Sequence, residues 1–131
     1  LVEEQEYFKK EIHPKINGTS IVFIGEVDNN QKNDLIGNAK ALLLPIEWFE
    51  PFPVVLPEAY ACGTPVLAFP GGGMEEGVFH GKTGFLCHSI EDMIEKVESI
   101  TKINRYECRK VAEELYSDKK IASDYLDLYQ N

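Results

Sequence analysis

The chain has 131 residues, 44% of them hydrophobic, which is about one domain with enough apolar side chains for a single core. Its formal net charge of -9 argues against nucleic acid or an anionic membrane as a partner, and no apolar run approaches the ~18 residues of a membrane span. The cysteines, Cys62, Cys87 and Cys108, form no C-x-x-C pair, which favours reduced thiols in a cytoplasmic protein.

Short apolar runs alternate with helical patterns along the first two thirds of the chain. Residues 1–13 are typical of an amphipathic helix that Pro14 ends. Apolar runs predict strands at residues 20–25, 41–45, 65–69 and 83–87, and the segments between them predict helices at residues 29–40 and 54–63 and one helical turn within 71–82. Residues 88–131 have helical patterns only, with Ser89 and Ser117 as expected N-caps. Strands that are apolar throughout indicate a parallel sheet covered on both faces, so we predict a doubly wound α/β fold.

Two carboxylates, Glu50 and Glu58, lie eight positions apart in the segment after the second predicted strand. Ligands of such sheets bind at the carboxyl ends of the strands, against helix N-termini. Val54 and Val55 would open the next helix, and the free N–H groups there suit a phosphate. Glu58, one turn further on, could accept hydrogen bonds from sugar hydroxyls. The spacing therefore fits a nucleotide, although two acids eight apart are also common on solvated surfaces without any ligand.

The surrounding residues resemble the C-terminal domain of glycosyltransferase family 4, whose enzymes have the GT-B fold. The resemblance rests on FIGEV, NAKALLLP, EPFPVVLPEAYACGTPVLAF, GGGMEEGVFHGKTGFLC and LYSDKKIASDYLDLY. It implies a Rossmann-like parallel sheet with helices on both faces. It also implies that residues 1–131 are a partial donor-binding domain, without the N-terminal acceptor domain and without the first two strands of its own sheet.

The same resemblance implies roles for individual residues. Glu50 would lie near the donor sugar, as the catalytic candidate, Glu58 would bind the ribose hydroxyls, and the amides of Val54 and Val55 would receive the diphosphate. Further donor-binding candidates are Phe52, Gly25, Glu26, Gly72 and Gly73, the last two followed by Glu76. The Gly-Gly loop is equally compatible with a tight turn that binds nothing.

The implied activity is a retaining, metal-independent transfer of a sugar from a nucleotide sugar, such as a UDP-, GDP- or ADP-sugar, with no other cofactor. The six aspartates include no D-x-D pair, and His13 and His88 lack partners at ligand spacing, so we expect no metal site. Residues 1–131 alone should lack turnover, because the acceptor side of a GT-B enzyme belongs to its other domain.

Two prolines depart from the family pattern. Pro53 stands where the family usually has glycine, and it removes one donor N–H beside the phosphate-binding amides. Pro57 is tolerable only within the first helical turn.

Two other functions remain open: a non-catalytic nucleotide-sugar-binding or partner-docking module, and a GT-B epimerase acting on the nucleotide sugar. Unpaired strand edges should bind the missing N-terminal domain or a second copy of the chain. Tyr125 and Tyr129 should be exposed.

Overall fold

Three short parallel strands form one sheet in residues 2–130, the part of the chain that the computed structural model describes. The strands β1 (Leu42–Leu44), β2 (Val66–Ala68) and β3 (Gly84–Leu86) lie in the order β1-β2-β3. Leu43 pairs with Leu67, and Leu67 pairs with Phe85. Three of the four predicted strands and the parallel arrangement are thus confirmed.

The strand predicted at residues 20–25 is wrong. Ile21–Ile24 pair with no strand, and all four side chains are exposed. The backbone groups of Val22, Phe23 and Ile24 make no hydrogen bonds within residues 2–130. A β-strand exists only when another backbone pairs with it, and no strand of the described chain lies beside this segment. The apolar run therefore predicts strand propensity but supplies no partner.

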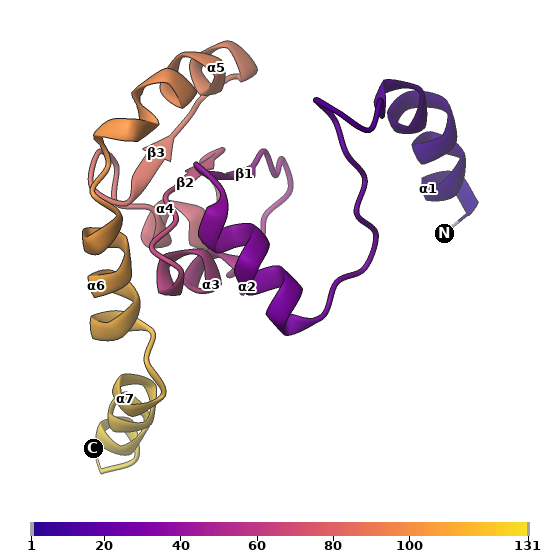
Figure 1. The fold of residues 1–131 in the computed structure, drawn as a ribbon. Coiled ribbons are helices and arrows are strands. Elements are labelled where there is room, and N and C mark those ends of the chain that lie inside the picture. The colour runs from indigo at the N-terminus through magenta and orange to yellow at the C-terminus, as the bar shows by residue number, and fades with distance from the viewer. Residues whose placement is uncertain (1, 131) are drawn as a thin grey trace.

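Helices surround the sheet, and one helix lies apart from it (Figure 1). The first, α1 (Val2–Tyr7), continues through a π-helical segment (Phe8–Ile12) into a 3-10 turn (His13–Lys15). Pro14 lies inside this turn, where its missing N–H costs no hydrogen bond, so the helical backbone ends at Lys15 and not before Pro14 as predicted. The remaining helices are α2 (Asn29–Asn38), α3 (Val55–Ala61), α4 (Gly73–Gly77), α5 (Ile90–Ser99), a 3-10 turn (Ile100–Lys102), α6 (Arg105–Leu115) and α7 (Asp118–Gln130). None of these described helices has the length and apolar character needed to cross a membrane.

The predicted N-caps of the two helices near the C-terminus are confirmed. The Ser89 hydroxyl accepts a hydrogen bond from the Asp92 N–H at 3.1 Å, and Ser117 accepts one from the Lys120 N–H at 3.3 Å. Each cap satisfies a backbone donor that the first helical turn leaves free. On α7, Tyr125 and Tyr129 are exposed, as expected.

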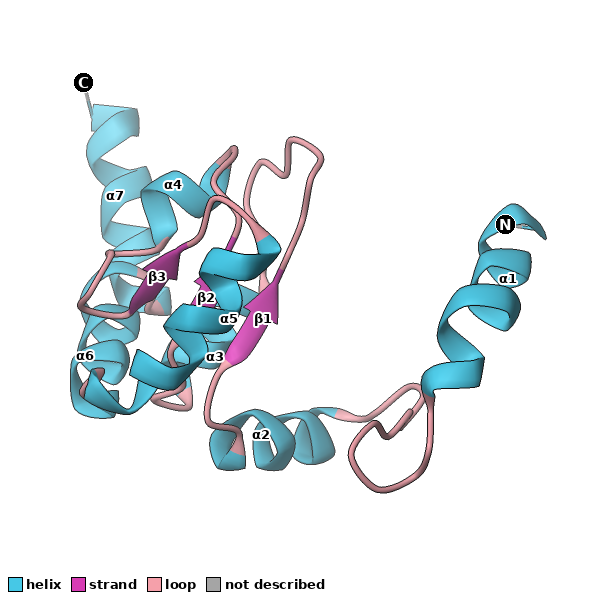
Figure 2. Cartoon of the chain, turned by 90° about the horizontal axis from the view of Figure 1, so that it is seen from above, coloured by secondary structure: helices cyan, strands magenta, loops and turns pink. Residues whose placement is uncertain are grey.

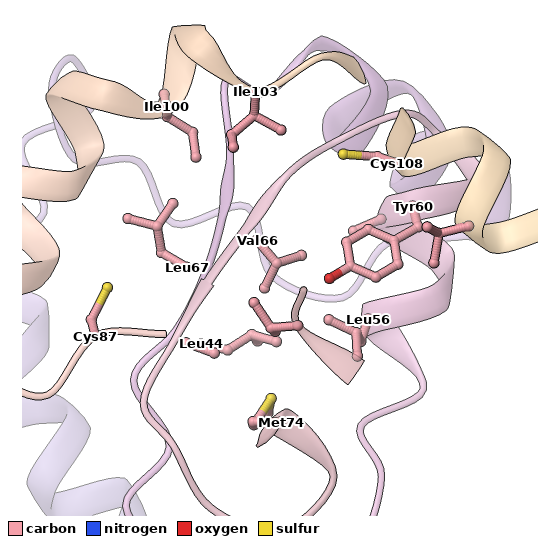
Figure 3. Packing of buried hydrophobic residues seen from close by; sticks show 14 of the residues in the cluster. Leu44, Leu56, Tyr60, Val66, Leu67, Met74, Cys87, Ile100, Ile103 and Cys108 are labelled. Carbon is pink, nitrogen blue, oxygen red and sulfur yellow. The ribbon is translucent and has the colours of Figure 1, made fainter. Parts of the chain in front are cut away.

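The core occupies both faces of the sheet. Along β2, Leu67 points to the side of Ile100 and Cys87, whereas Val66 points to the side of Tyr60 and Leu56 (Figure 3). The first side is covered by α5 and the second by α3, with α6 packed against α3 (Figure 2). The fold is therefore the Rossmann-like α/β arrangement that the sequence predicts.

The end of α3 is fixed by a glycine turn. Gly63 has a φ of +69°, a left-handed conformation that glycine adopts without strain. Its N–H donates to the Tyr60 carbonyl at 2.8 Å, and the Thr64 N–H donates to the Ala59 carbonyl at 2.8 Å. This Schellman pattern closes the helix and sends the chain directly into β2. Because both ends of α3 are defined, the first turn of α3 has a fixed place beside the carboxyl end of β1.

Candidate functional site

The first turn of α3 carries two open backbone donors. Val54 is its N-cap residue and Val55 its first helical residue, which confirms where the helix was predicted to open. The Leu56 N–H already donates to the Pro53 carbonyl at 3.0 Å, but the N–H groups of Val54 and Val55 donate to no group within residues 2–130. Two amides at this helix end are thus available to an anion.

Both prolines of the segment are accommodated. Pro57 is the third residue of α3, so its missing N–H falls in the first turn, where helices have no internal acceptor to lose. Pro53 is buried directly before the N-cap. It contributes a carbonyl to the helix start but no donor.

Glu58 projects from the first turn of α3 toward α2. Its Oε1 accepts a hydrogen bond from the Lys32 ammonium at 2.6 Å, and the two side chains are 31% and 30% exposed. Lys32 precedes Glu58 by 26 residues, and nothing in the linear spacing connects them. Sequence reasoning missed Lys32, although its place in a helix that flanks α3 is the one signal that could have suggested it.

Glu50 lies in the loop between β1 and α3 and is half-buried. The Trp48 indole N–H donates to Glu50 Oε2 at 3.3 Å. The Glu50 carbonyl accepts from the Gly73 N–H at 2.8 Å. The loop that follows β1 is therefore joined to the loop that follows β2 at the carboxyl edge of the sheet.

Gly72 and Gly73 make this contact possible. A Cβ on Gly72 would lie 2.2 Å from the Glu50 carbonyl oxygen, and a Cβ on Gly73 would lie 2.3 Å from the Pro51 carbonyl oxygen. Gly72 also has a φ of +52°, which disfavours other residues. The two glycines are thus required by the approach of one loop to the other, a reason that is independent of any ligand.

The remaining candidates are more dispersed. The Phe52 ring packs against the Tyr116 ring, with 5.6 Å between centroids, and Glu76 is exposed on α4. Gly25 and Glu26 lie exposed in the segment that leads into α2. No hydrogen bond joins either of them to the start of α3 within residues 2–130. The structure therefore brings Glu50, Gly72 and Gly73 together at one edge but does not bring Gly25 and Glu26 into that group.

The titratable groups with shifted pKa values lie in the core. Burial raises the pKa of Tyr60, whose hydroxyl donates to the Gly77 carbonyl at 3.0 Å. Burial, and then the Glu76 carboxylate, raise the pKa of Tyr116. No group of three or more His, Cys, Asp or Glu side chains able to hold a metal ion occurs in the described part of the chain. The arrangement at the start of α3 is suited to holding an anion and hydroxyl groups.

The sequence matches known proteins along most of its length. A family model described as "Glycosyl transferases group 1" matches residues 2–117. N-acetyl-alpha-D-glucosaminyl L-malate synthase of Bacillus anthracis is 31% identical over 117 residues, which cover 83% of this chain and 30% of that protein. Glycogen synthase of Mycobacterium tuberculosis is 40% identical over 65 residues, which cover 50% of this chain and 16% of that protein. The chain thus spans less than a third of the length of these relatives.

Solved structures share the fold. The Anabaena protein Alr3699/HepE, in a crystal structure with UDP, is 25% identical and superimposes with a TM-score of 0.84 over 99% of this chain and 38% of its own. Sucrose-phosphate synthase from Thermosynechococcus elongatus is 24% identical, with a TM-score of 0.81 over 98% of this chain and 34% of its own. The second likeness shows the fold alone.

Proposed function

Because the chain belongs to the glycosyl transferases group 1 family, we propose that residues 1–131 are the donor-binding part of a transferase that moves a sugar from a nucleotide sugar to an acceptor. The transfer would be retaining and metal-independent. The acceptor would be bound by a further, N-terminal domain.

One observation carries this proposal: the first turn of one helix carries both two unpaired amides and a carboxylate. The N–H groups of Val54 and Val55 have no acceptor within residues 2–130, and Glu58 follows in the same turn. Amides at a helix start favour the charge of a diphosphate. An ionised carboxylate only accepts hydrogen bonds, so Glu58 suits the two hydroxyls of a ribose. The diphosphate and ribose of one nucleotide would bind these two features side by side.

Glu50 would act at the sugar end of the same ligand. Its loop is held against Gly72 and Gly73, so the backbone that carries the Glu50 carboxylate is fixed in position. In transfer, the bond between the sugar and the diphosphate would break, the oxygen of an acceptor hydroxyl would form the new bond to the sugar, and the hydroxyl proton would pass to an oxygen of the departing diphosphate. The leaving diphosphate takes up negative charge, which the amides at the start of α3 would stabilise. Phe52 would complete the donor pocket, whereas Gly25 and Glu26 lie outside this group of residues.

UDP is the first nucleotide to test, because Alr3699/HepE was solved in complex with UDP. A GDP- or ADP-sugar is equally compatible with the contacts proposed here. None of those contacts involves the base through a side chain.

A non-catalytic binding module is the second candidate, and Pro53 favours it. A proline at this position cannot donate a hydrogen bond to the ligand. Loss of a donor beside the leaving group would weaken stabilisation of the transition state more than binding of the ground state. Such a module would bind the nucleotide and would not transfer the sugar.

Isothermal titration calorimetry with UDP, GDP and ADP tests the donor site. We expect one of the three to bind, and we expect Glu58→Ala to weaken that binding by about tenfold or more, from the loss of hydrogen bonds to a charged group. Glu114→Ala is the matched control, because Glu114 is an exposed helical glutamate on α6. Binding of none of the nucleotides, or equal binding by Glu58→Ala and the wild type, would reject the proposal.

A further inference from the structure

The ion pair between Lys32 and Glu58 differs from the other ion pairs in residues 2–130. Four of those join residues four positions apart within one continuous helical stretch, and the fifth, Lys82–Glu107, is longer at 3.7 Å and more exposed. Lys32–Glu58 joins α2 to α3 at 2.6 Å, with about a third of each side chain exposed. Partial burial reduces the solvent screening that makes most surface ion pairs weak.

The pair holds one oxygen of the carboxylate and leaves the other open. Lys32 donates to Oε1 of Glu58, and Oε2 accepts no hydrogen bond within residues 2–130. An unpaired glutamate samples several rotamers, and ordering such a side chain on binding costs affinity. A lysine that fixes Oε1 removes part of that cost. It leaves Oε2 open on a carboxylate that the first turn of α3 carries, the same turn that begins with the open amides.

We propose that Lys32 is a positioning residue for Glu58: it orients the carboxylate toward the ribose hydroxyls and thereby sets the preference of the site for a nucleotide with an intact ribose. This inference rests on the proposed function. It adds a residue on α2 to a site that otherwise consists of α3 and the two loops at the carboxyl edge of the sheet.

The inference predicts a ligand-selective effect that a merely structural ion pair would not produce. If Lys32 acts through Glu58, its removal weakens only the ligands that Glu58 contacts. A UDP analogue whose ribose lacks both hydroxyls has nothing for Glu58 to accept from. The affinity of the chain for this analogue should therefore not change when Lys32 is replaced.

The experiment measures dissociation constants of UDP and of this analogue for the complete chain and its variants. The wild type should bind UDP about tenfold more tightly than the analogue, the value of a hydrogen bond to a charged group. Lys32→Met should weaken UDP by about threefold to fivefold, the range of a partly exposed ion pair, and leave the analogue unchanged. Lys32→Arg, which keeps the positive charge, should bind UDP as tightly as the wild type does. In a Glu58→Gln background, Lys32→Met should have no further effect.

Lys82→Met is the matched control, since it removes a lysine that pairs with a glutamate of another element away from the site. Lys32→Gln serves as a second variant if Lys32→Met does not fold, as judged by circular dichroism and urea unfolding. If Lys32→Met weakens binding of UDP and of the analogue equally, the inference is overturned, because Lys32 then acts on the phosphates that both ligands carry. Unchanged UDP binding by Lys32→Met and by Lys32→Gln would also overturn it.

Failure of the proposed function has a different result. In that case the wild type binds neither ligand, or binds both equally, before any substitution at Lys32 is considered, and the role of Lys32 fails with it. A wild type that prefers UDP, together with Lys32 variants that behave as the wild type does, would reject the role of Lys32 alone.

Discussion

The Gly73 N–H donates to the carbonyl oxygen of Glu50 at 2.8 Å, and this bond ties the loop after β1 to the loop after β2. The carboxyl ends of neighbouring parallel strands meet at one edge of the sheet, so the two loops are adjacent, but glycine is what allows their backbones to touch. The position of the Glu50 carboxylate therefore depends on a residue that has no side chain.

Replacing Gly73 with alanine should displace the Glu50 loop. The new Cβ would lie 2.3 Å from the Pro51 carbonyl oxygen and 2.9 Å from the Phe52 Cα, and backbone atoms cannot rotate away. We expect Gly73→Ala to lower the free energy of unfolding by about 1–3 kcal/mol, the range for overpacking, in a urea titration. Gly37→Ala is the control, because a Cβ there meets nothing within 4 Å. A Gly73→Ala protein as stable as Gly37→Ala would contradict this packing.

Arg105 holds the ends of two helices together. Its guanidinium donates to the carbonyls of Ala39 and Gly37, both at 2.7 Å, and to the Thr64 hydroxyl at 2.9 Å. Arg105→Met should cost about 1–2 kcal/mol of unfolding free energy, because it leaves carbonyls at the end of α2 without a donor.

The control for Arg105 is Lys110→Met, which removes an exposed ion pair with 3.8 Å between charged atoms on α6. We expect that variant to remain within about 0.5 kcal/mol of the wild type. Equal losses in the two variants, measured by urea unfolding, would show that the guanidinium contacts contribute nothing specific.

The buried thiol of Cys108 should make stability depend on pH in the alkaline range. Burial raises the pKa of Cys108 from 9.0 to about 11. The folded chain therefore keeps a proton that the unfolded chain loses first. Stability due to this group is present below pH 9.0 and declines as pH rises toward about 11. The unfolding free energy of the wild type should fall more steeply over this interval than that of Cys108→Ser, and identical slopes would contradict the assignment.

The apolar row Ile21–Ile24 should mediate association of the chain. These side chains are exposed, and the backbone groups of Val22, Phe23 and Ile24 are unpaired within residues 2–130, a combination that favours pairing with another strand. Sedimentation velocity should show concentration-dependent association that a Val22→Lys, Ile24→Lys double variant reduces. Ile90→Lys, an exposed apolar position on α5, should leave it unchanged. A wild-type chain that stays monomeric at all concentrations would refute this role.

Local signals in the sequence predicted the elements well, because each depends on residues close in the chain. Ser89 and Ser117 cap their helices through hydrogen bonds three residues away, and Gly63 ends α3 through its own conformation. The strands predicted at residues 41–45, 65–69 and 83–87 pair with one another in the sheet, so their apolar patterns were sufficient to predict them. Ile21–Ile24 carry the same pattern without a neighbouring strand, and the prediction failed there.

The candidate site was predictable in part for the same reason. Val54, Val55 and Glu58 lie within one helical turn, so their relation follows from helix geometry. The Lys32–Glu58 pair depends on how α2 packs against α3, and the need for Gly72 and Gly73 depends on how two loops meet. No pattern in the sequence indicates either relation, because both are set by tertiary packing.

Binding of a diphosphate to the amides of Val54 and Val55 can be followed in amide NMR spectra recorded during a titration with UDP. We expect the resonances of these two residues to shift with UDP and to stay in place with uridine, which has the same ribose and base but no phosphate. Saturable binding of UDP that leaves both resonances unmoved, or equal shifts with uridine, would contradict it.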